Sequence, residues 1–472
     1  MTDRGLKTLE TFMFATAPQD LSENLAGWRD ELRAQYVGAA SDHLRDEAAE
    51  LLAENAVDLQ SVLVDWNLKS KCRHGDQALT DEQLAAEAGK SLAVLDEWGR
   101  LEMANVARAK AAAIANSNLA RLARMALAGK VNTFWGNDYA ANLREAMRKG
   151  AAMVTTNPVL VNVARTENPA YWTPVRDNLK ARYPDYDPVQ LGYAMTIEVV
   201  LSNARLLRPI WQITGGKMGY VSLQLSPKEA KNADAMIEGA RWVWERLEAG
   251  LAGTPNCVFK VPGTKAGITV AETLTSGAMG VNVTVNFSLP QQIAFAGAIE
   301  NNSTTPVSYR TQMDGRLDDP VGEELKEAGV SDWEEVKKWC TTAIRQREYR
   351  MLCLPPDQGG LGFKKSIPLP ASGRGPWNIL RSLTTGPVPI FLTIFPNRAE
   401  EFDSEPRELD PDGMWAELPD GYLDKLYMSK LFRQGYEPDG MTVDEFDDYL
   451  PVVATLNQFA DGYDEFIAWV AG

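Results

Sequence analysis

A single lysine, Lys260, stands in the short apolar segment Cys257-Val-Phe-Lys-Val-Pro262, whose composition is typical of a buried strand. Burial disfavours an ammonium group and lowers its pKa, so a lysine in such a strand can act as a nucleophile and form a Schiff base with a carbonyl substrate. The alternative is a lysine near a strand end whose amine extends into solvent. The neighbouring segments favour the first interpretation.

Polar residues alternate with apolar ones in the segments that flank Lys260. Asn282 and Thr284 alternate with valines, and Ser222 and Gln224 alternate with valine and leucine. Successive strand residues point to opposite faces, so each polar pair shares one face. Buried parallel strands are normally apolar throughout. The pattern therefore predicts a barrel interior that is hydrophilic at one end, where a substrate's hydroxyls would satisfy the buried amides.

Charged residues follow two of the later predicted strands. Arg316 and Arg374 come after the sixth and seventh strands. Loops at this place in a barrel commonly hold phosphate, and the planar guanidinium suits that task. A surface ion pair is the alternative for each arginine. We interpret Asp314, Asp318 and Asp319 as a solvated face, because three acids without spaced partners rarely form a metal site.

These residues need a scaffold, and the second part of the chain supplies a regular one. Short strand-like segments alternate there with helical patterns, which implies a parallel sheet with right-handed crossovers. Eight units predict an α/β fold, the closed (β/α)₈ TIM barrel; an open, doubly wound sheet is the alternative, but no GxGxxG follows the first strand. The predicted strands are 131–135, 151–156, 219–225, 257–261, 280–286, 305–311, 366–371 and 389–395.

Three regions are expected along the chain. Residues 1–130 are rich in Ala, Leu, Glu and Arg and predict an all-helical extension, with a capping box at Thr80–Gln83. Residues 131–396 form the predicted barrel. Residues 397–472 predict helices that pack on it. The extension shows no chemistry, so we expect it to serve packing or oligomerisation, and a homo-oligomer is one expectation.

Composition excludes several classes of protein. The 472 residues are 45% hydrophobic and 24% charged, as in ordinary globular proteins, and the net charge of −16 argues against nucleic acid or an anionic membrane as the main partner. Four scattered cysteines and two histidines, His43 and His74, predict neither a zinc site, a disulfide framework nor a histidine-based triad. The sequence shows no signal-peptide pattern and no apolar run of membrane-spanning length, so a cytoplasmic protein is expected.

Four segments together resemble the transaldolase family. They occur in the family's order within residues 131–396: Val154-Thr-Thr-Asn-Pro158, Phe259-Lys-Val-Pro-Gly-Thr264, Gly280-Val-Asn-Val-Thr-Val-Asn-Phe-Ser288 and Ala371-Ser-Gly-Arg374. The segment Phe459–Phe466 is weakly similar to a transaldolase C-terminus. The first 130 residues have no recognised counterpart.

The resemblance implies a transferase that needs neither a metal nor an organic cofactor. Lys260 would form an iminium with the ketone of a sugar phosphate, and a dihydroxyacetone unit would pass to an aldehyde acceptor, as in the pentose phosphate pathway. Thr284 would orient the catalytic water. By position, the resemblance also implies a set of substrate-binding residues, comprising Asn157, Asn282, Thr311, Arg316, Ser372 and Arg374.

The chain departs from the family pattern in three places. The family has an aspartate at the end of the first strand, but the simplest alignment puts Gly136 there, and Asp138 fits only if the strand shifts by two residues. A glutamate of the third strand is Gln224 here, as in the fructose 6-phosphate aldolase subgroup, and an amide cannot act as a general base. That subgroup has a tyrosine where this chain has Met313.

Three functions therefore stay open from the sequence. The first is a transaldolase-type transferase, with Lys260, Thr284, Gln224 and Asp138 as catalytic residues. The second is a lyase similar to fructose 6-phosphate aldolase, which Gln224 favours. The third is a barrel that binds a ligand or partner without catalysis.

Overall fold

Eight parallel strands form the centre of the molecule. The computed structural model describes residues 18–66 and 80–472, and all eight predicted strands are present in it, each shifted by no more than a few residues. They are β1 (Thr133–Asn137), β2 (Met153–Thr155), β3 (Tyr220–Gln224), β4 (Cys257–Pro262), β5 (Val281–Thr284), β6 (Ser308–Met313), β7 (Ser366–Ala371) and β8 (Ile390–Ile394).

The strands follow one another around a barrel. Their order is β7-β6-β5-β4-β3-β2-β1-β8, every pair is parallel, and β7 lies beside β8 to complete the circle. The predicted TIM barrel is confirmed, and the open doubly wound sheet is excluded. In such a barrel the carboxyl ends of all strands meet at one end, where catalytic residues gather.

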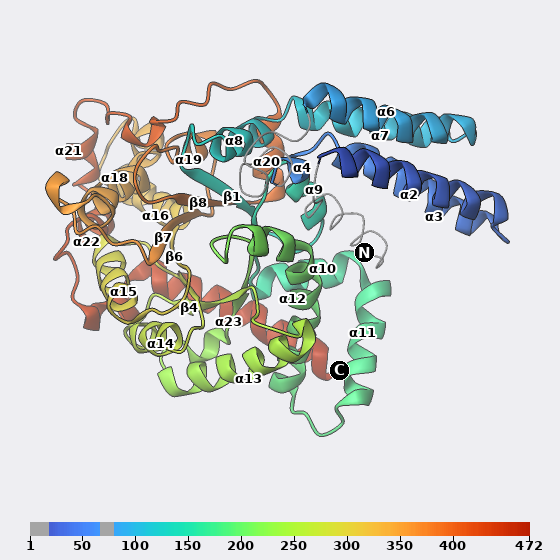
Figure 1. Ribbon diagram of the computed structural model, residues 1–472. Coiled ribbons are helices and arrows are strands. Elements are labelled where there is room, and N and C mark those ends of the chain that lie inside the picture. The colour runs from blue at the N-terminus through green and yellow to red at the C-terminus, as the bar shows by residue number, and fades with distance from the viewer. Residues whose placement is uncertain (1–17, 67–79) are drawn as a thin grey trace.

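Helices cover the outside of the barrel (Figure 1). Several begin with a side-chain cap, such as Ser288, whose hydroxyl accepts from Gln291 N in a capping box. The helices between and after the strands are α9 (Leu143–Arg148), α10 (Pro158–Glu167), α11 (Pro169–Arg182), α12 (Pro188–Ile213), α13 (Ala233–Leu251), α14 (Lys265–Ser276), α15 (Leu289–Asn302), α16 (Asp314–Glu327), α17 (Trp333–Lys337), α18 (Cys340–Glu348), α19 (Pro376–Leu380) and α20 (Pro396–Asp403).

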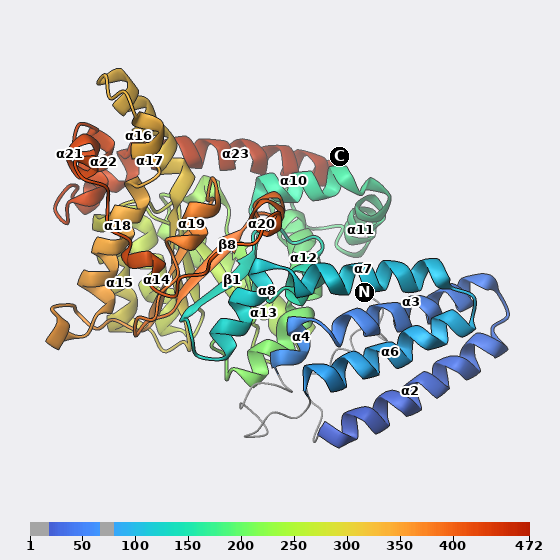
Figure 2. The same cartoon turned by 90° about the horizontal axis from the view of Figure 1, so that it is seen from above.

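The N-terminal helices form an arm that extends to one side of the barrel (Figure 1, Figure 2). The predicted capping box of Thr80 and Gln83 begins one of them. The arm meets the barrel where Asp58 accepts from Arg148 Nε of α9 at 2.7 Å. The helices of this part are α2 (Pro18–Gly38), α3 (Asp42–Asp58), α4 (Val62–Val64), α6 (Asp81–Glu97), α7 (Leu101–Ala115) and α8 (Asn118–Leu127).

The C-terminal helices return to the barrel. The long helix α23 (Leu450–Ala471) packs against α10 and α12, and Asn162 Nδ2 donates to Gly462 O at 2.6 Å across this contact. Two shorter helices, α21 (Tyr422–Leu426) and α22 (Lys430–Tyr436), lie near α16 to α18. The boundaries of the three regions as separate domains stay a prediction.

The barrel interior changes character along its axis. Aromatic rings fill the end where the strands begin: Tyr220 and Phe391 each lie edge-to-face on Tyr309, and Phe134 stacks on Phe391. These rings close that end with a packed apolar layer. The polar interior residues lie toward the carboxyl ends of the strands. The site is therefore open at that end only.

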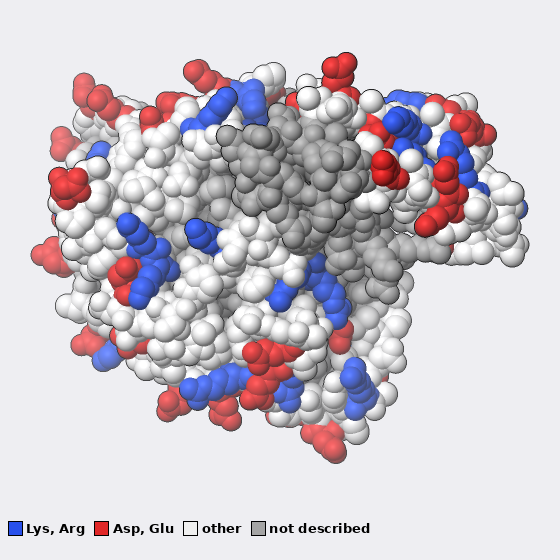
Figure 3. Space-filling view, viewed as in Figure 1, with Lys and Arg blue, Asp and Glu red and all other residues white. Residues whose placement is uncertain are grey.

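Charged side chains of both signs are interspersed over the face of the molecule in Figure 3. None of the helices in residues 18–66 and 80–472 is long and apolar enough to cross a bilayer. Of the cysteines, Cys257, Cys340 and Cys353 are free and buried. Cys72 and His74 lie outside the described residues.

Candidate active site

Lys260 lies inside the barrel, on β4. Only 7% of it is exposed, and in the sheet register it stands between Gln224 of β3 and Asn282 of β5. Burial, the largest influence, lowers the pKa of Lys260; the Asp138 carboxylate opposes this effect and the Arg316 guanidinium adds to it. A lysine with a lowered pKa supplies more neutral amine near neutral pH, which is the form that attacks a carbonyl.

A pocket opens above Lys260 and encloses about 360 Å³. Eight of the ten predicted site residues line it, from six different strands or the loops that follow them. They are Asp138, Asn157, Lys260, Asn282, Thr284, Thr311, Arg316 and Ser372. The other two, Gln224 and Arg374, do not line the pocket and are treated below. The structure thus brings most of the predicted residues to one place.

Asp138 takes the place at the end of the first strand. The strand ends at Asn137, and the Thr155 hydroxyl of β2 donates to the Asp138 carboxylate. Gly136 lies two residues earlier on the same face. A Cβ atom there would stand 2.7 Å from Met153 O, so the close approach of β2 explains the glycine. A shift of two residues preserves the side-chain direction, which is how Asp138 reaches the pocket.

A chain of hydrogen bonds fixes the orientation of Asn282. Its Nδ2 donates to Ser222 Oγ at 3.0 Å, and its Oδ1 accepts from Thr311 Oγ1 at 2.7 Å. These bonds join β3, β5 and β6 through side chains that are all buried. Thr284 lies two residues after Asn282 on β5. Among the described residues, its hydroxyl makes a weak contact of 3.9 Å with the Met313 sulfur. Its oxygen therefore remains available to a ligand or water.

The two predicted arginines differ in their surroundings. Arg316 lines the pocket, donates to Gln458 Oε1 at 2.5 Å, and lies over the Phe459 ring at 5.2 Å, so α23 helps to hold it. Arg374 is 39% exposed, and its Nε donates to Asp319 at 2.9 Å. Burial and then the Arg374 guanidinium lower the pKa of Arg316, so the two positive charges act on each other.

Ser372 and Gln224 complete the predicted set. Ser372 lines the pocket with a left-handed backbone (φ 57°), which is uncommon for a residue with a side chain. Gln224 is half-buried and occupies the register position beside Lys260, and its Oε1 atom is buried without a hydrogen-bond partner among the described residues. An unpaired buried acceptor at this position is suited to receive a bond from a ligand or water.

The prediction for the acids after β6 is wrong. Asp314 is 1% exposed and Asp318 is 3% exposed, whereas a solvated face was expected. The segment that contains α17 and α18 covers them, and it supplies Arg345 to Asp314 and the Thr341 backbone N–H to Asp318. Only Asp319 is partly exposed, at 44%. These partners could not be predicted locally, because they lie more than twenty residues further along the chain.

The pocket also contains residues that the sequence analysis did not select. Thr155 could have been found, since it lies two residues before Asn157 in the segment Val154–Pro158, which already resembled the family. Phe459 comes from the last helix and depends on tertiary contact alone. The unpredicted lining residues are Thr155, Met313, Leu369, Ala371, Thr393, Phe395 and Phe459. Within the described part of the chain, no three His, Cys, Asp or Glu side chains are placed to hold a metal ion.

Fold and site together define a (β/α)₈ barrel with a buried lysine, whose pKa is lowered, and an arginine, Arg316, in the lining of the same pocket. Residues 140–450 match the family model described as Transaldolase/Fructose-6-phosphate aldolase. This match covers well over half of the chain, and the chain belongs to that family.

Curated relatives agree with this assignment. A protein named Transaldolase from Neisseria meningitidis serogroup C (strain 053442) is 31% identical over 216 residues, which are 41% of this chain and 59% of that protein. A Transaldolase from Thiobacillus denitrificans is 33% identical over 142 residues, 30% of this chain and 37% of the relative. Transaldolase 1 from Streptomyces avermitilis is 29% identical over 207 residues, which are 42% of this chain and 53% of that protein. The chain thus spans 59% or less of the length of these relatives.

Proposed function

We propose that this protein transfers a dihydroxyacetone unit between phosphorylated sugars through a Schiff base on Lys260. The observation that carries the proposal is the position of Lys260. It is a buried lysine with a lowered pKa, it lines a polar pocket, and Arg316 stands in the same lining. Family membership and relatives named transaldolase support the same conclusion. The activity would place the protein in the pentose phosphate pathway, and a cytoplasmic location stays a prediction.

The first step is the attack of the neutral Lys260 amine on the ketone carbon of the donor sugar. The carbinolamine that forms loses its oxygen as water and becomes an iminium. The positively charged iminium then accepts electrons from a neighbouring carbon–carbon bond, which is what makes cleavage feasible. The lowered pKa of Lys260 favours the attack on the ketone, because a larger fraction of the amine is neutral near pH 7 than in an exposed lysine.

Cleavage needs a base for the donor hydroxyl on the far side of the breaking bond. Asp138 is the carboxylate in the pocket lining, and Thr155 orients it. It accepts the hydroxyl proton while the bonding electrons move to the iminium, leaving an enamine and a free aldehyde. The enamine then attacks the carbonyl carbon of an acceptor aldehyde, and Asp138 returns its proton to the new hydroxyl as the iminium re-forms. Water hydrolyses this iminium and releases the product from Lys260.

The remaining residues bind the substrate in this proposal. Asn157, Asn282 and Thr311 hold its hydroxyls, and Arg316, Ser372 and Arg374 hold its phosphate. A phosphate between the two arginines would reduce their mutual repulsion. This repulsion contributes to the lowered pKa of Arg316. Arg374 reaches it after exchanging Asp319 for the phosphate. Thr284, whose hydroxyl has only a weak partner, orients the water of hydrolysis.

A lyase that releases free dihydroxyacetone is the second candidate, and Gln224 favours it. The amide beside Lys260 cannot move a proton, so a transferase with Gln224 must rely on Asp138 alone for proton transfer. The two candidates share every step up to the enamine. They differ in whether an acceptor aldehyde or a proton completes the reaction.

The direct test is borohydride trapping with fructose 6-phosphate, followed by intact mass and peptide mapping. We expect a stable adduct on Lys260 and none in Lys260→Ala. Lys265→Ala is the matched control, since Lys265 is an exposed lysine five positions away and should leave the adduct unchanged. If a folded wild-type protein forms no adduct with a panel of ketose phosphates, the catalytic proposal fails and a ligand-binding barrel remains.

The acceptor test separates the two candidates. Turnover of fructose 6-phosphate is measured with and without erythrose 4-phosphate. A transferase requires the acceptor, whereas a lyase releases dihydroxyacetone in its absence. Product release that is independent of the acceptor would replace the first proposal by the second.

A further inference from the structure

The loop after β7 carries Ser372 and Arg374, two of the three residues assigned above to phosphate binding. We propose that Asp314, held between Arg345 and Asn378, is a positioning residue that fixes this loop in its phosphate-binding shape. The inference rests on the proposed function for the role of the loop. It adds three residues that bind no substrate themselves and act through the loop.

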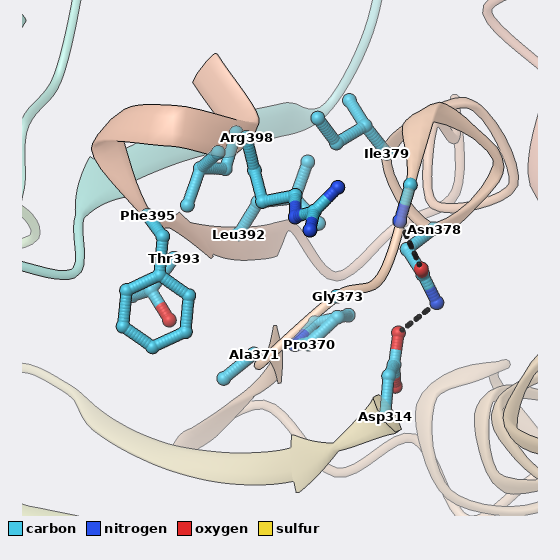
Figure 4. Close-up of a pocket in the computed structure, with 12 residues that line it drawn as sticks. Asp314, Pro370, Ala371, Gly373, Asn378, Ile379, Leu392, Thr393, Phe395 and Arg398 are labelled. Atoms are coloured by element: carbon cyan, nitrogen blue, oxygen red, sulfur yellow. Dashed lines mark hydrogen bonds between the residues drawn. The ribbon is translucent and has the colours of Figure 1, made fainter. Parts of the chain in front are cut away.

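Asn378 is the link between Asp314 and the loop. Its Oδ1 accepts from Arg374 N at 2.8 Å. The same oxygen accepts from Gly375 N at 3.3 Å, and Asn378 Nδ2 donates to Asp314 Oδ2 at 3.0 Å (Figure 4). The Asn378 amide thus makes three hydrogen bonds: its oxygen accepts from two backbone donors and its nitrogen donates to the carboxylate. Asn378 is 3% exposed, so water does not compete for these bonds.

Arg345 fixes the other side of Asp314. Its Nη1 lies 3.1 Å from both carboxylate oxygens, and each side chain is 1% exposed. A buried carboxylate that accepts charge-assisted bonds is held in one orientation. The orientation of Asp314 then determines that of the Asn378 amide, and through it the position of the Arg374 backbone.

The residues next to Asp314 hold the same loop directly. Gly315 N donates to Ser372 O at 3.1 Å, which supports the left-handed backbone of Ser372. A Cβ atom on Gly315 would stand 2.5 Å from the Arg374 guanidinium carbon, so the absence of a side chain at Gly315 leaves room for the Arg374 side chain. Arg316 follows immediately and lines the reaction pocket. The segment 314–316 therefore fixes the position of the loop that carries Arg374 and also carries Arg316 itself.

The loop also borders a second pocket, between itself and β8, which is lined by Gly373, Gly375, Leu392 and Arg398 among others (Figure 4). The hydrogen bonds that Asn378 accepts from Arg374 N and Gly375 N hold the loop backbone. The Asn378–Asp314 bond fixes the amide that accepts them.

The test compares variants by their affinity for inorganic phosphate and for fructose 6-phosphate, measured by calorimetry. Asn378→Asp places a second carboxylate against Asp314 and should weaken phosphate binding about tenfold to a hundredfold, the loss of one charge-assisted bond. The swap Asp314→Asn with Asn378→Asp restores a donor facing an acceptor and should recover the affinity to within about threefold.

Asp318→Asn is the matched control. Asp318 is buried on the same helix as Asp314, but it bonds Thr341 and does not reach the loop. It should lower the melting temperature without changing phosphate affinity. Equal loss in Asp318→Asn, no loss in a folded Asn378→Asp, or no recovery in the swap would each overturn the proposal.

A further measurement separates this inference from the proposed function. Borohydride trapping on Lys260 with unphosphorylated dihydroxyacetone should be unchanged in all the folded variants, because this substrate carries no phosphate for the loop to bind. Phosphate affinity that follows Asp314 and Asn378 supports the inference even if no adduct forms in the wild type, whereas wild-type protein that binds no phosphate contradicts it.

Discussion

Two of the buried basic side chains, Lys260 and Arg148, respond to burial in opposite ways. Lys260 in the barrel interior has one carboxylate, Asp138, acting on it, and burial lowers its pKa. Arg148, where the helical arm meets α9, is fully buried and bonds Asp58 and Glu145, each at 2.7 Å. Burial acts against its charge as well, but the carboxylates of Asp58, Glu145 and Glu54 raise the pKa of Arg148.

The difference shows that burial alone does not make a reactive site. Desolvation penalises both cations, and the number of facing carboxylates decides whether the charge is retained. Where the arm meets α9, three carboxylates stabilise the charged form of Arg148, and the ion pairs join the arm to the barrel. In the barrel the second charged neighbour is Arg316, which is also positive, so Lys260 loses its proton more readily.

The largest effect is expected from Lys260→Met. Without the amine no iminium forms, so turnover should fall by about 10⁴-fold or more. Stability should stay the same or rise, because a methionine of similar length removes a poorly compensated buried charge. Steady-state kinetics and thermal unfolding measure the two quantities. A folded Lys260→Met protein with near-normal turnover would remove the lysine from the mechanism.

The matched substitution Arg148→Met should behave in the opposite way. It removes one of the two guanidinium groups that pair with the buried Asp58 and leaves Arg144 as the other, so we expect a cost of about 1.5–3 kcal/mol of unfolding free energy, the contribution of a hydrogen bond to a charged group. Urea unfolding followed by circular dichroism measures the loss. Asp30→Asn breaks an exposed pair with Arg33 and serves as the control, with an expected change of about 0–1 kcal/mol. If Arg148→Met were as stable as the wild type, the contact would not be structural.

The two arginines proposed to bind phosphate should differ in the size of their effect, and the more buried one should have the larger effect. Arg316→Gln is expected to lower kcat/KM for fructose 6-phosphate by about 100-fold, because a charge-assisted bond in a partly buried site contributes about 1.5–3 kcal/mol. Arg374→Gln should cost only about tenfold, since Arg374 is exposed and must give up Asp319. Unphosphorylated substrates should show little change in either variant. The reverse order of effects would place the phosphate nearer to Arg374.

The smallest effect is a shift in pH dependence. Asp138 raises the pKa of Lys260 and Arg316 lowers it, although burial is the larger influence. Asp138→Asn should therefore lower that pKa further and move the acid limb of adduct formation to lower pH, whereas Arg316→Gln should move it to higher pH. The rate of borohydride trapping with unphosphorylated dihydroxyacetone measures the limb without needing Asp138 as a base. A shift in the same direction in both variants would contradict the electrostatic account.

The sequence by itself determined the barrel and the centre of its site. Short strand-like segments between helical patterns predicted all eight strands. Period-two alternation predicted the shared face of Asn282 and Thr284, because side-chain direction in a strand is a local property. The isolated lysine in an apolar strand identified Lys260 for the same reason. The resemblance added Asn157, Thr311 and Ser372, and it agreed with the phosphate role that strand position had indicated for the two arginines.

Only the tertiary structure decided which groups meet across long chain separations. It placed Asp138 rather than Gly136 at the end of the first strand, buried Asp314 under Arg345, and turned Arg374 toward Asp319. These outcomes depend on which distant segment covers a residue. Local alternation cannot contain that information, because the free energy of a buried charge is set by neighbours brought together only when the chain folds.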